Sequence, residues 1–494
     1  MKRITINPIT RLEGHGRIEI FLDESGKVAN AYLQVPELRG FERFCVGRAA
    51  EEMPAITSRI CGVCPEAHSM AAVKALDDLF RTPPTSTARK IRELLYSAFF
   101  VTDHTLHFYA LGGPDFIVGP DAPPAERNIL GVMRKVGLET GRKVIDCRAR
   151  NHEVIQTLGG RGIHPIGGVP GGWSKPVSEE ERRRIAEAAR ENVEFARFSL
   201  AVFDKLVLGN PAYVDLIRAE TYRQTTYSMG TVNESGCLNF YDGKIRVVDP
   251  EGAEFARYDA REYTSHIAER VEPWSYMKFP YLKKVGWKGF VEGADSGVYS
   301  ATPLSRLNVA DRLATPLAQA EFERFYETLG SGKVNGRYRP VHLRLATHWA
   351  RLIELLYAAE RMAELANDPE ITSPDIRSIP KGTAAGEGIG SVEAPRGTLT
   401  HHYTADDRGV LTAVNLVVGT TNNHAAISMS IRKAARELID GRGADDALLN
   451  QVEMAFRLYD PCMSCATHSL GTTPLILTVR DARGEAVRTV RRDP

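Results

Sequence analysis

The chain opens with two short runs in which apolar and polar residues alternate, the pattern of strands that bury one face. Residues 17–22 alternate in period two, residues 24–27 have the composition of a turn, and residues 28–33 form the second run. Two alternating runs that are joined by a short turn predict a β-hairpin.

Apolar residues at helical spacing predict long helices in the middle of the chain and near its end. The strongest pattern covers residues 178–208, where Ser178 and Glu181 have the spacing of a capping box. Further helices are predicted at residues 86–109, 340–365, 425–438 and 447–458.

Shorter alternating runs and glycine-rich stretches indicate smaller β elements around these helices. Residues 209–300 predict a second sheet region, with residues 244–248 as one strand. Residues 381–390 predict a glycine-rich loop, followed by a hairpin that reaches residue 418. The whole pattern predicts an α+β fold, with a central bundle of long helices and small peripheral sheets and hairpins.

Composition excludes some partners without indicating a function. The 494 residues include 63 basic and 62 acidic side chains, so the net charge of +1 gives no general attraction to nucleic acid or to an anionic membrane. We find no apolar segment of signal-peptide or membrane-spanning length. We therefore expect a cytoplasmic protein without membrane insertion and without a nucleic-acid partner.

The cysteines carry the first chemical signal. The chain has 7 cysteines, and four of them form two CxxC pairs, Cys61 with Cys64 and Cys462 with Cys465. Such a count in a long chain without a secretory signal favours thiol or metal chemistry over disulfides. The single cysteines at 45, 147 and 237 have the pattern of small buried apolar residues.

Several kinds of site can use two CxxC pairs. Counting sulfurs alone favours a closed tetrahedral zinc site, although the pairs of a zinc ribbon usually lie tens of residues apart and these lie at opposite ends of the chain. A thioredoxin-like dithiol would need a pair that opens a helix after a strand. The third interpretation is a nickel and iron centre, because thiolates suit both metals and can bridge them. The sulfur count does not choose between zinc and this centre.

The residues around the pairs do distinguish them. The first pair lies in RICGVC, followed by His68, and the second in DPCMSCATH, which ends at His468. The chain also contains RLEGHG at 11–16 and EAPRG at 393–397. In this order, and together with residues 37–42 and 103–109, these motifs resemble the signature set of the large, catalytic subunits of nickel-iron hydrogenases. The resemblance implies one intimately packed unit over residues 1–468, which oxidises dihydrogen reversibly.

The resemblance implies a role for each cysteine. Cys64 and Cys465 would bridge nickel and iron, Cys61 and Cys462 would bind nickel terminally, and the iron would carry carbon monoxide and cyanide. A terminal thiolate in a partly desolvated pocket is basic enough to accept a proton when dihydrogen is cleaved heterolytically. Glu13 matches the carboxyl that then carries the proton away, whereas without the motif a solvated charge would be the safer interpretation.

Other residues would shape the pocket around the metals. By resemblance, Arg396 lies over the vacant metal position, and Pro395 and Thr420 line the diatomic ligands. Asp115 and Asp460 match the carboxylates that hold the arginine, since a buried arginine without partners is costly. Outside the motif, an arginine in a loop is ordinarily a surface charge.

His68 would hydrogen-bond a bridging sulfur, although helical spacing alone favours an ordinary core histidine. Glu42, His468 and a backbone carbonyl near Leu416 match the ligands of a structural magnesium ion. Gly419 stands where the family more commonly has proline, which affects the assignment of Thr420.

The end of the chain and its remaining cysteines imply partners. Residues 469–494 correspond to a C-terminal propeptide that a maturation protease removes, with an ordinary terminal strand at 474–479 as the alternative. The three single cysteines cannot supply the four thiolates of a usual iron-sulfur cluster, so we expect no such cluster in this chain. An iron-sulfur small subunit would carry the electrons, with diaphorase or other electron-transfer subunits leading to NAD or to a heterodisulfide or viologen-type acceptor.

Two alternatives remain outside this interpretation. The quinone-site subunit of respiratory complex I resembles these proteins in fold but lacks both cysteine pairs. A zinc-stapled structural subunit of a redox complex would give Glu13 and Arg396 no common purpose.

Overall fold

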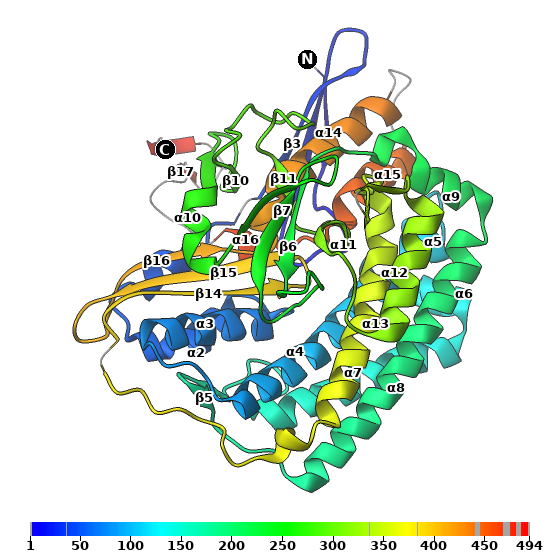
Figure 1. Cartoon of the computed structure of the whole chain (residues 1–494). Helices are drawn as coiled ribbons and strands as arrows, with labels where there is room; N and C mark the ends of the chain where they lie inside the picture. Colours follow the sequence, from blue (N-terminus) through cyan, green and yellow to red (C-terminus); the bar gives the residue numbers. More distant parts are fainter. Residues whose placement is uncertain are drawn as a thin grey trace.

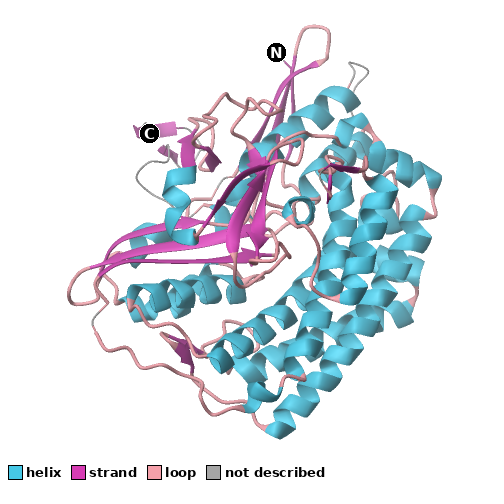
Figure 2. Ribbon diagram, in the orientation of Figure 1, coloured by secondary structure: helices cyan, strands magenta, loops and turns pink. Residues whose placement is uncertain are grey.

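The computed structural model describes residues 2–35, 37–334, 336–382, 384–439, 445–467, 475–480 and 486–492. It confirms the predicted α+β class. Figure 2 shows long helices side by side over one part of the molecule, while the sheets gather over the other. Among the described residues, no helix is long and apolar enough to cross a lipid bilayer.

The helix bundle is organised around a buried helix, α13. This helix packs against α8, α4 and α12, and α4 also packs against α7. Polar caps begin the helices: Thr85 Oγ1 accepts the Ala88 N–H at the start of α4, and the predicted capping box of Ser178 and Glu181 is present at the start of α8. The bundle consists of α4 (Ser86–Leu106), α7 (Leu138–Gly159), α8 (Glu179–Phe203), α12 (Pro316–Leu329) and α13 (Thr347–Ala366).

The three largest sheets of the described residues lie on one side of this bundle. The predicted N-terminal hairpin forms the order β1-β2-β3, with β1 (Lys2–Ile6), β2 (Arg17–Leu22) and β3 (Val28–Gln34). The second sheet has the order β11-β6-β7-β8, with β6 (Tyr227–Val232), β7 (Lys244–Val248), β8 (Glu254–Tyr258) and β11 (Tyr299–Ser300). The third has the antiparallel order β14-β15-β16, with β14 (Gly386–Ala394), β15 (Gly397–Ala405) and β16 (Leu411–Val417).

The glycines at 386, 388 and 390 lie in strand β14, so the prediction of a loop there was wrong. Because side chains alternate along a strand, these glycines share one face. A Cβ at Gly388 would lie 2.3 Å from the Ala75 oxygen, and one at Gly390 would lie 2.3 Å from the Ala71 oxygen, both in α3 (Pro65–Leu79). Glycine therefore lets β14 lie directly against the helix that follows the first cysteine pair.

The remaining helices and strands connect the helix bundle and the sheets. The predicted helix at 340–365 begins only at Thr347, since residues 344–346 form the 3₁₀ turn η7 (Arg344–Ala346). The C-terminal helices α14 and α15 pack together, and α14 contacts β3, so a helix from the last part of the chain lies beside the N-terminal sheet (Figure 1). The other helices are α1 (Phe41–Cys45), α2 (Met53–Thr57), α5 (Pro114–Ile117), α6 (Ile129–Val136), α9 (Pro211–Arg218), α10 (Tyr263–His266), α11 (Pro303–Val309), α14 (His424–Leu438), α15 (Asp446–Arg457) and α16 (Met463–Ala466). The other strands are β4 (Gly168–Val169), β5 (Gly172–Trp173), β9 (Ile267–Val271), β10 (Lys278–Leu282), β12 (Lys333–Val334), β13 (Arg337–Tyr338), β17 (Leu475–Arg480) and β18 (Ala486–Arg492).

Candidate metal centre

The two cysteine pairs meet at one buried cluster. The Sγ atoms of Cys61, Cys64, Cys462 and Cys465 all lie within 4.8 Å of one another. Cys61 Sγ lies 3.4 Å from Cys462 Sγ, and Cys64 Sγ lies 3.4 Å from Cys465 Sγ. No residue of the cluster is more than 4% exposed. The opposite ends of the chain thus contribute equally to a single site.

Short turns aim the sulfurs inward. Cys61 follows the 3₁₀ turn η2 (Ser58–Ile60), and Cys64 occupies the N-cap position of α3, with Pro65 in the first turn of this helix. The N–H groups of Val63 and Cys64 both donate to Cys61 Sγ at 3.2 Å. Amides that point at a sulfur in this way support a thiolate. In the second pair, Cys462 occupies the N-cap position of α16 and Cys465 lies within this helix.

The cluster fits a soft metal ion. Burial raises the pKa of the Cys462 and Cys465 thiols well above the ordinary value, so a thiolate at either position needs a compensating cation. Four sulfurs that converge in a dry pocket suit zinc, nickel or iron. The four sulfurs therefore fit the predicted nickel and iron. Because they also fit zinc, the groups around the sulfurs must distinguish a nickel-iron site from a zinc site.

Glu13 reaches this cluster from the N-terminal segment. Its Oε2 lies 2.9 Å from Cys462 Sγ and accepts the Ser464 N–H at 3.2 Å. The backbone oxygen of Glu13 accepts the Met463 N–H at 2.9 Å. Gly14 allows this approach, because it has φ of +80° and a Cβ there would lie 2.8 Å from Ser464 N. A carboxyl group at hydrogen-bond distance from a thiol can exchange a proton with it.

Arg396 lies in the turn between β14 and β15 and is 3% exposed. Its Nη1 pairs with Asp103 Oδ2 at 3.0 Å and its Nη2 with Asp460 Oδ2 at 3.1 Å. Burial raises the pKa of Asp460 to about 7, against the opposing effect of Arg396. The predicted pairing with Asp460 is thus present in the geometry.

The predicted pairing of Arg396 with Asp115 was wrong. Asp115 binds Arg11 and Arg457 instead, and Asp103 occupies the expected position beside Arg396. Asp103 lies on α4, in the motif at 103–109, and this motif was the signal that could have identified it. Sequence spacing does not reveal which of two acidic residues so close in sequence faces the arginine.

His68 lies on α3 beside the second cysteine pair. Its Nε2 is 3.4 Å from Cys465 Sγ, and its Nδ1 is 3.2 Å from His401 Nε2. His401 Nδ1 is in turn 2.6 Å from the Tyr403 hydroxyl. This chain of contacts is satisfied when Tyr403 donates to His401, His401 donates to His68, and His68 donates to the sulfur. His401 and Tyr403 were missed by sequence reasoning, because no motif marks them.

Pro395 and Thr420 each form a hydrogen bond to a residue from another segment of the chain. Thr420 Oγ1 accepts the Cys462 N–H at 3.0 Å, and the Pro395 oxygen accepts from Arg306 Nη2 at 3.0 Å. Gly419 permits close packing, since a Cβ there would lie 2.9 Å from the Gly397 oxygen. Arg306 is fully buried and also pairs with Glu354, a second contact that the sequence did not predict.

The predicted magnesium ligands are described only in part. Glu42 Oε1 accepts the Leu416 N–H at 2.8 Å, which brings these two residues together. Lys278 Nζ lies 3.8 Å from Glu42 Oε2 and 3.0 Å from Glu269 Oε2. His468 lies outside the described residues, as do the side chains of the predicted propeptide. Glu42 offers the oxygen that magnesium prefers, and Lys278 already balances part of its charge.

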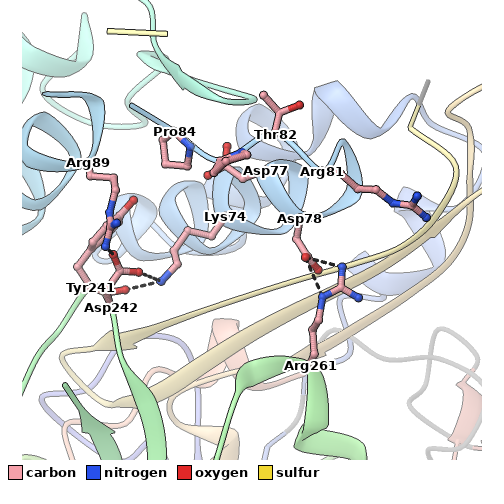
Figure 3. Close-up of a pocket in the computed structure, with 11 residues that line it drawn as sticks. Lys74, Asp77, Asp78, Arg81, Thr82, Pro84, Arg89, Tyr241, Asp242 and Arg261 are labelled. Carbon is pink, nitrogen blue, oxygen red and sulfur yellow. Dashed lines mark hydrogen bonds and ion pairs between the residues drawn. The ribbon is translucent and has the colours of Figure 1, made fainter. Parts of the chain in front are cut away.

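A hollow of about 540 Å³ lies at the surface between α3 and the segment around Tyr241. Figure 3 shows that its charges face one another: Lys74 pairs with Asp242, and Arg261 pairs with Asp78. Paired surface charges of this kind are common and indicate no ligand. The buried sulfur cluster is therefore the candidate functional site.

Comparison with known proteins agrees with this choice. The family described as nickel-dependent hydrogenase matches residues 39–128 and 143–468, and the family described as HoxL-like matches residues 3–38. The chain is 48% identical to an F420-non-reducing hydrogenase iron-sulfur subunit of Archaeoglobus profundus, over 99% of this chain and 100% of that protein. It is 37% identical to the NAD-reducing hydrogenase HoxS subunit beta of Cupriavidus necator, over 98% of this chain and 99% of that protein.

Solved structures show the same relationship. A crystal structure of an NAD⁺-reducing [NiFe]-hydrogenase in the H2-reduced state superposes with a TM-score of 0.87, at 38% identity, over 95% of this chain and 100% of that one. Sequence, fold and the buried four-cysteine cluster agree: the chain is a large subunit of the nickel-dependent hydrogenase family.

Proposed function

We propose that this chain converts dihydrogen reversibly into two protons and two electrons at a nickel and iron centre that is held by its four clustered cysteines. The observation that carries the proposal is the contact between Glu13 Oε2 and Cys462 Sγ within this cluster. A structural zinc site needs four sulfurs but has no use for a carboxyl group beside one of them.

The cysteines, Arg396 and its two carboxylate partners have different roles in the proposed reaction. Cys61 and Cys462 would bind nickel terminally, and Cys64 and Cys465 would bridge it to iron. When bound, the two metals supply the electrophilic site at which the H–H bond is polarised. Arg396 presents a fixed positive charge in the same pocket, and Asp103 and Asp460 hold it in place.

The proton leaves through two groups of this chain. Cys462 Sγ accepts the proton, and its S–H bond then breaks as an O–H bond forms on Glu13. The Ser464 N–H holds Glu13 Oε2 at this position. Pro395 and Thr420 would line the carbon monoxide and cyanide ligands of the iron, and His68 would donate a hydrogen bond to a bridging sulfur.

Electrons would leave through other subunits. One relative of this chain is, by name, subunit beta of an NAD-reducing hydrogenase, a protein that therefore has further subunits. We propose that an iron-sulfur small subunit is the direct partner, with diaphorase or other electron-transfer subunits that reduce NAD or another soluble acceptor in the cytoplasm.

The proposal includes a maturation step at the C-terminal end of the chain. Residues 1–468 would form the working unit, and a protease would remove residues 469–494 after the metals are inserted. Glu42, the backbone near Leu416 and His468 would then hold a magnesium ion, which oxygen ligands suit.

The contact of Glu13 provides the test. In the purified complex, we expect Glu13→Gln to lower deuterium exchange between D2 and water by about 100-fold or more, because the relay carboxyl is gone. Nickel and iron content should stay as in the wild type. Glu24→Gln, in the exposed turn of the hairpin, is the matched control. The proposal would be contradicted if Glu13→Gln exchanged D2 with water at the wild-type rate, or if the wild-type complex showed no such exchange.

A further inference from the structure

Asp115 forms the centre of a buried ion cluster that the proposed chemistry does not use. The residue is 1% exposed and lies on α5. Arg457 Nη1 lies 3.1 Å from both of its carboxylate oxygens, and Arg11 Nη2 pairs with Oδ1. Despite burial, the two arginines hold the pKa of Asp115 below its ordinary value. The carboxylate therefore stays charged between two guanidinium groups.

Further contacts tie the same cluster to the N-terminal segment. Thr10 donates to Glu453 Oε2 at 2.8 Å and accepts from Arg457 Nη2 at 3.0 Å. Glu453 also pairs with Arg457, and Asn450 Oδ1 accepts from Arg457 Nη1 at 2.8 Å. Two arginines, one aspartate and one glutamate balance their charges, as a buried ionic cluster requires.

The cluster lies at the base of the two segments that carry the proton-transfer pair. Arg11 comes two residues before Glu13, and Arg457 comes five residues before Cys462. Beyond the cluster, the Met463 N–H donates to the Glu13 oxygen at 2.9 Å. Each segment is thus fixed at the ion cluster and again at the sulfur.

The backbone between these points is strained in both segments. Arg11 has φ of 57° and Asp460 has φ of 54°, a region that residues with a side chain adopt at a cost. Such conformations persist only where the surroundings enforce them. The ion pair with Asp115 acts on Arg11 itself, whereas Asp460 is held by its pair with Arg396 and by its N–H, which donates to the Arg457 backbone oxygen at 2.9 Å.

We propose that Asp115, with Arg11 and Arg457, is a positioning cluster that sets the distance between Glu13 and Cys462. The proposal rests on the proposed function, because that distance matters only if a proton passes between the two groups. Buried ion pairs add little net stability compared with apolar packing, and fixing one geometry is a role that they can serve.

Asp115→Asn tests the proposal, with Asp77→Asn as the matched control. Asp77 forms another buried ion pair, with Arg92, at the far end of α3, and contacts neither segment. Asp115→Asn keeps the shape of the aspartate side chain and removes its charge. We expect D2 exchange with water to fall by about 10- to 100-fold, since displacement of a reacting group by about 1 Å has effects of that size.

Protection of the backbone gives an independent measurement. Hydrogen exchange followed by mass spectrometry should show the Met463 amide exchanging at least about tenfold faster in Asp115→Asn, and unchanged in Asp77→Asn. Nickel content should equal that of the wild type. If Asp115→Asn does not fold, Arg11→Lys keeps the positive charge, loses the planar fork and should show the same two effects.

If Asp115→Asn exchanges D2 with water at the wild-type rate and its Met463 amide is protected as in the wild type, the positioning role is overturned. The hydrogenase proposal is not affected by that result. An equal loss of D2 exchange in Asp77→Asn would also overturn the positioning role, because the effect would then reflect any buried ion pair. A wild-type complex without D2 exchange would instead refute the proposed function itself.

Discussion

At the scale of single residues, a buried histidine keeps one protonation state in the folded chain. His107 and His348 stack with ring centroids 5.5 Å apart, and a Cβ at Gly112 would lie 2.5 Å from His348 Cε1. Burial, together with the positive charge of Arg351, lowers the pKa of His348 to about 3. His348 is therefore neutral in the folded protein throughout the physiological range.

This neutral histidine predicts a pH dependence of stability. The unfolded chain takes up a proton at His348 below pH 6.5, the ordinary value, whereas the folded chain does so only near pH 3. Stability is therefore lost as pH falls through this window, by about 1.4 kcal/mol per pH unit. Between about pH 6.5 and about pH 5, the wild type should lose about 2 kcal/mol more unfolding free energy than His348→Gln.

Urea unfolding at both pH values measures this difference. Parallel pH curves for the wild type and His348→Gln would show that the buried histidine is not the source of the acid sensitivity.

The acidic residues show where prediction from sequence ends at this scale. The motifs identified the cysteines, Glu13, Arg396 and Asp460, and the structure brings these side chains together. They indicated Asp115 in place of Asp103, because the end of α4 and a π-helical turn lie between these residues and set their directions only in three dimensions. His401 and Tyr403 were missed because their role depends on the packing of β15 against α3.

At the scale of secondary structure, the close packing of α3 against β14 controls where the first cysteine pair lies. Cys64 occupies the N-cap position of α3, and the glycine face of β14 allows the backbones to approach. Side chains in β14 would push the helix away, since a Cβ at Gly390 also lies 2.3 Å from Ala75 N. The position of Cys64 relative to Cys465 therefore depends on residues without side chains.

Gly390→Ala tests this dependence. The added Cβ collides with backbone atoms that cannot rotate away, so we expect a loss of about 1–3 kcal/mol in unfolding free energy and reduced nickel content in the purified chain. Gly382→Ala is the control, because a Cβ there meets nothing within 4 Å. Equal nickel content and stability in both variants would contradict the packing argument.

The elements themselves were largely predictable, and their exceptions have physical causes. Helices with strong apolar periodicity and polar caps, such as α8, appear where they were expected. The glycines of β14 have no side chains, so the strand gave no hydrophobic pattern and resembled a loop. Long-range packing, which the local sequence does not express, decided that case.

At the scale of the whole molecule, the site exists only because both ends of the chain converge. One hydrophobic core runs from Ile6 to Cys465 and includes all four cluster cysteines. Within the chain, α14 packs on β3, and Met463 bonds to Glu13, so the N-terminal and C-terminal segments stabilise each other. Spacing in the sequence could not show this convergence; the resemblance of the motifs supplied it, and the structure accounts for it.

The metal content of the purified complex, combined with its infrared spectrum, tests the central claim most directly. We expect about one nickel and about one additional iron per chain at the four-sulfur cluster, together with infrared bands of metal-bound carbon monoxide and cyanide. Cys462→Ala should lose the nickel and the bands, whereas Cys45→Ala should keep both. Stoichiometric zinc without these bands would contradict the account.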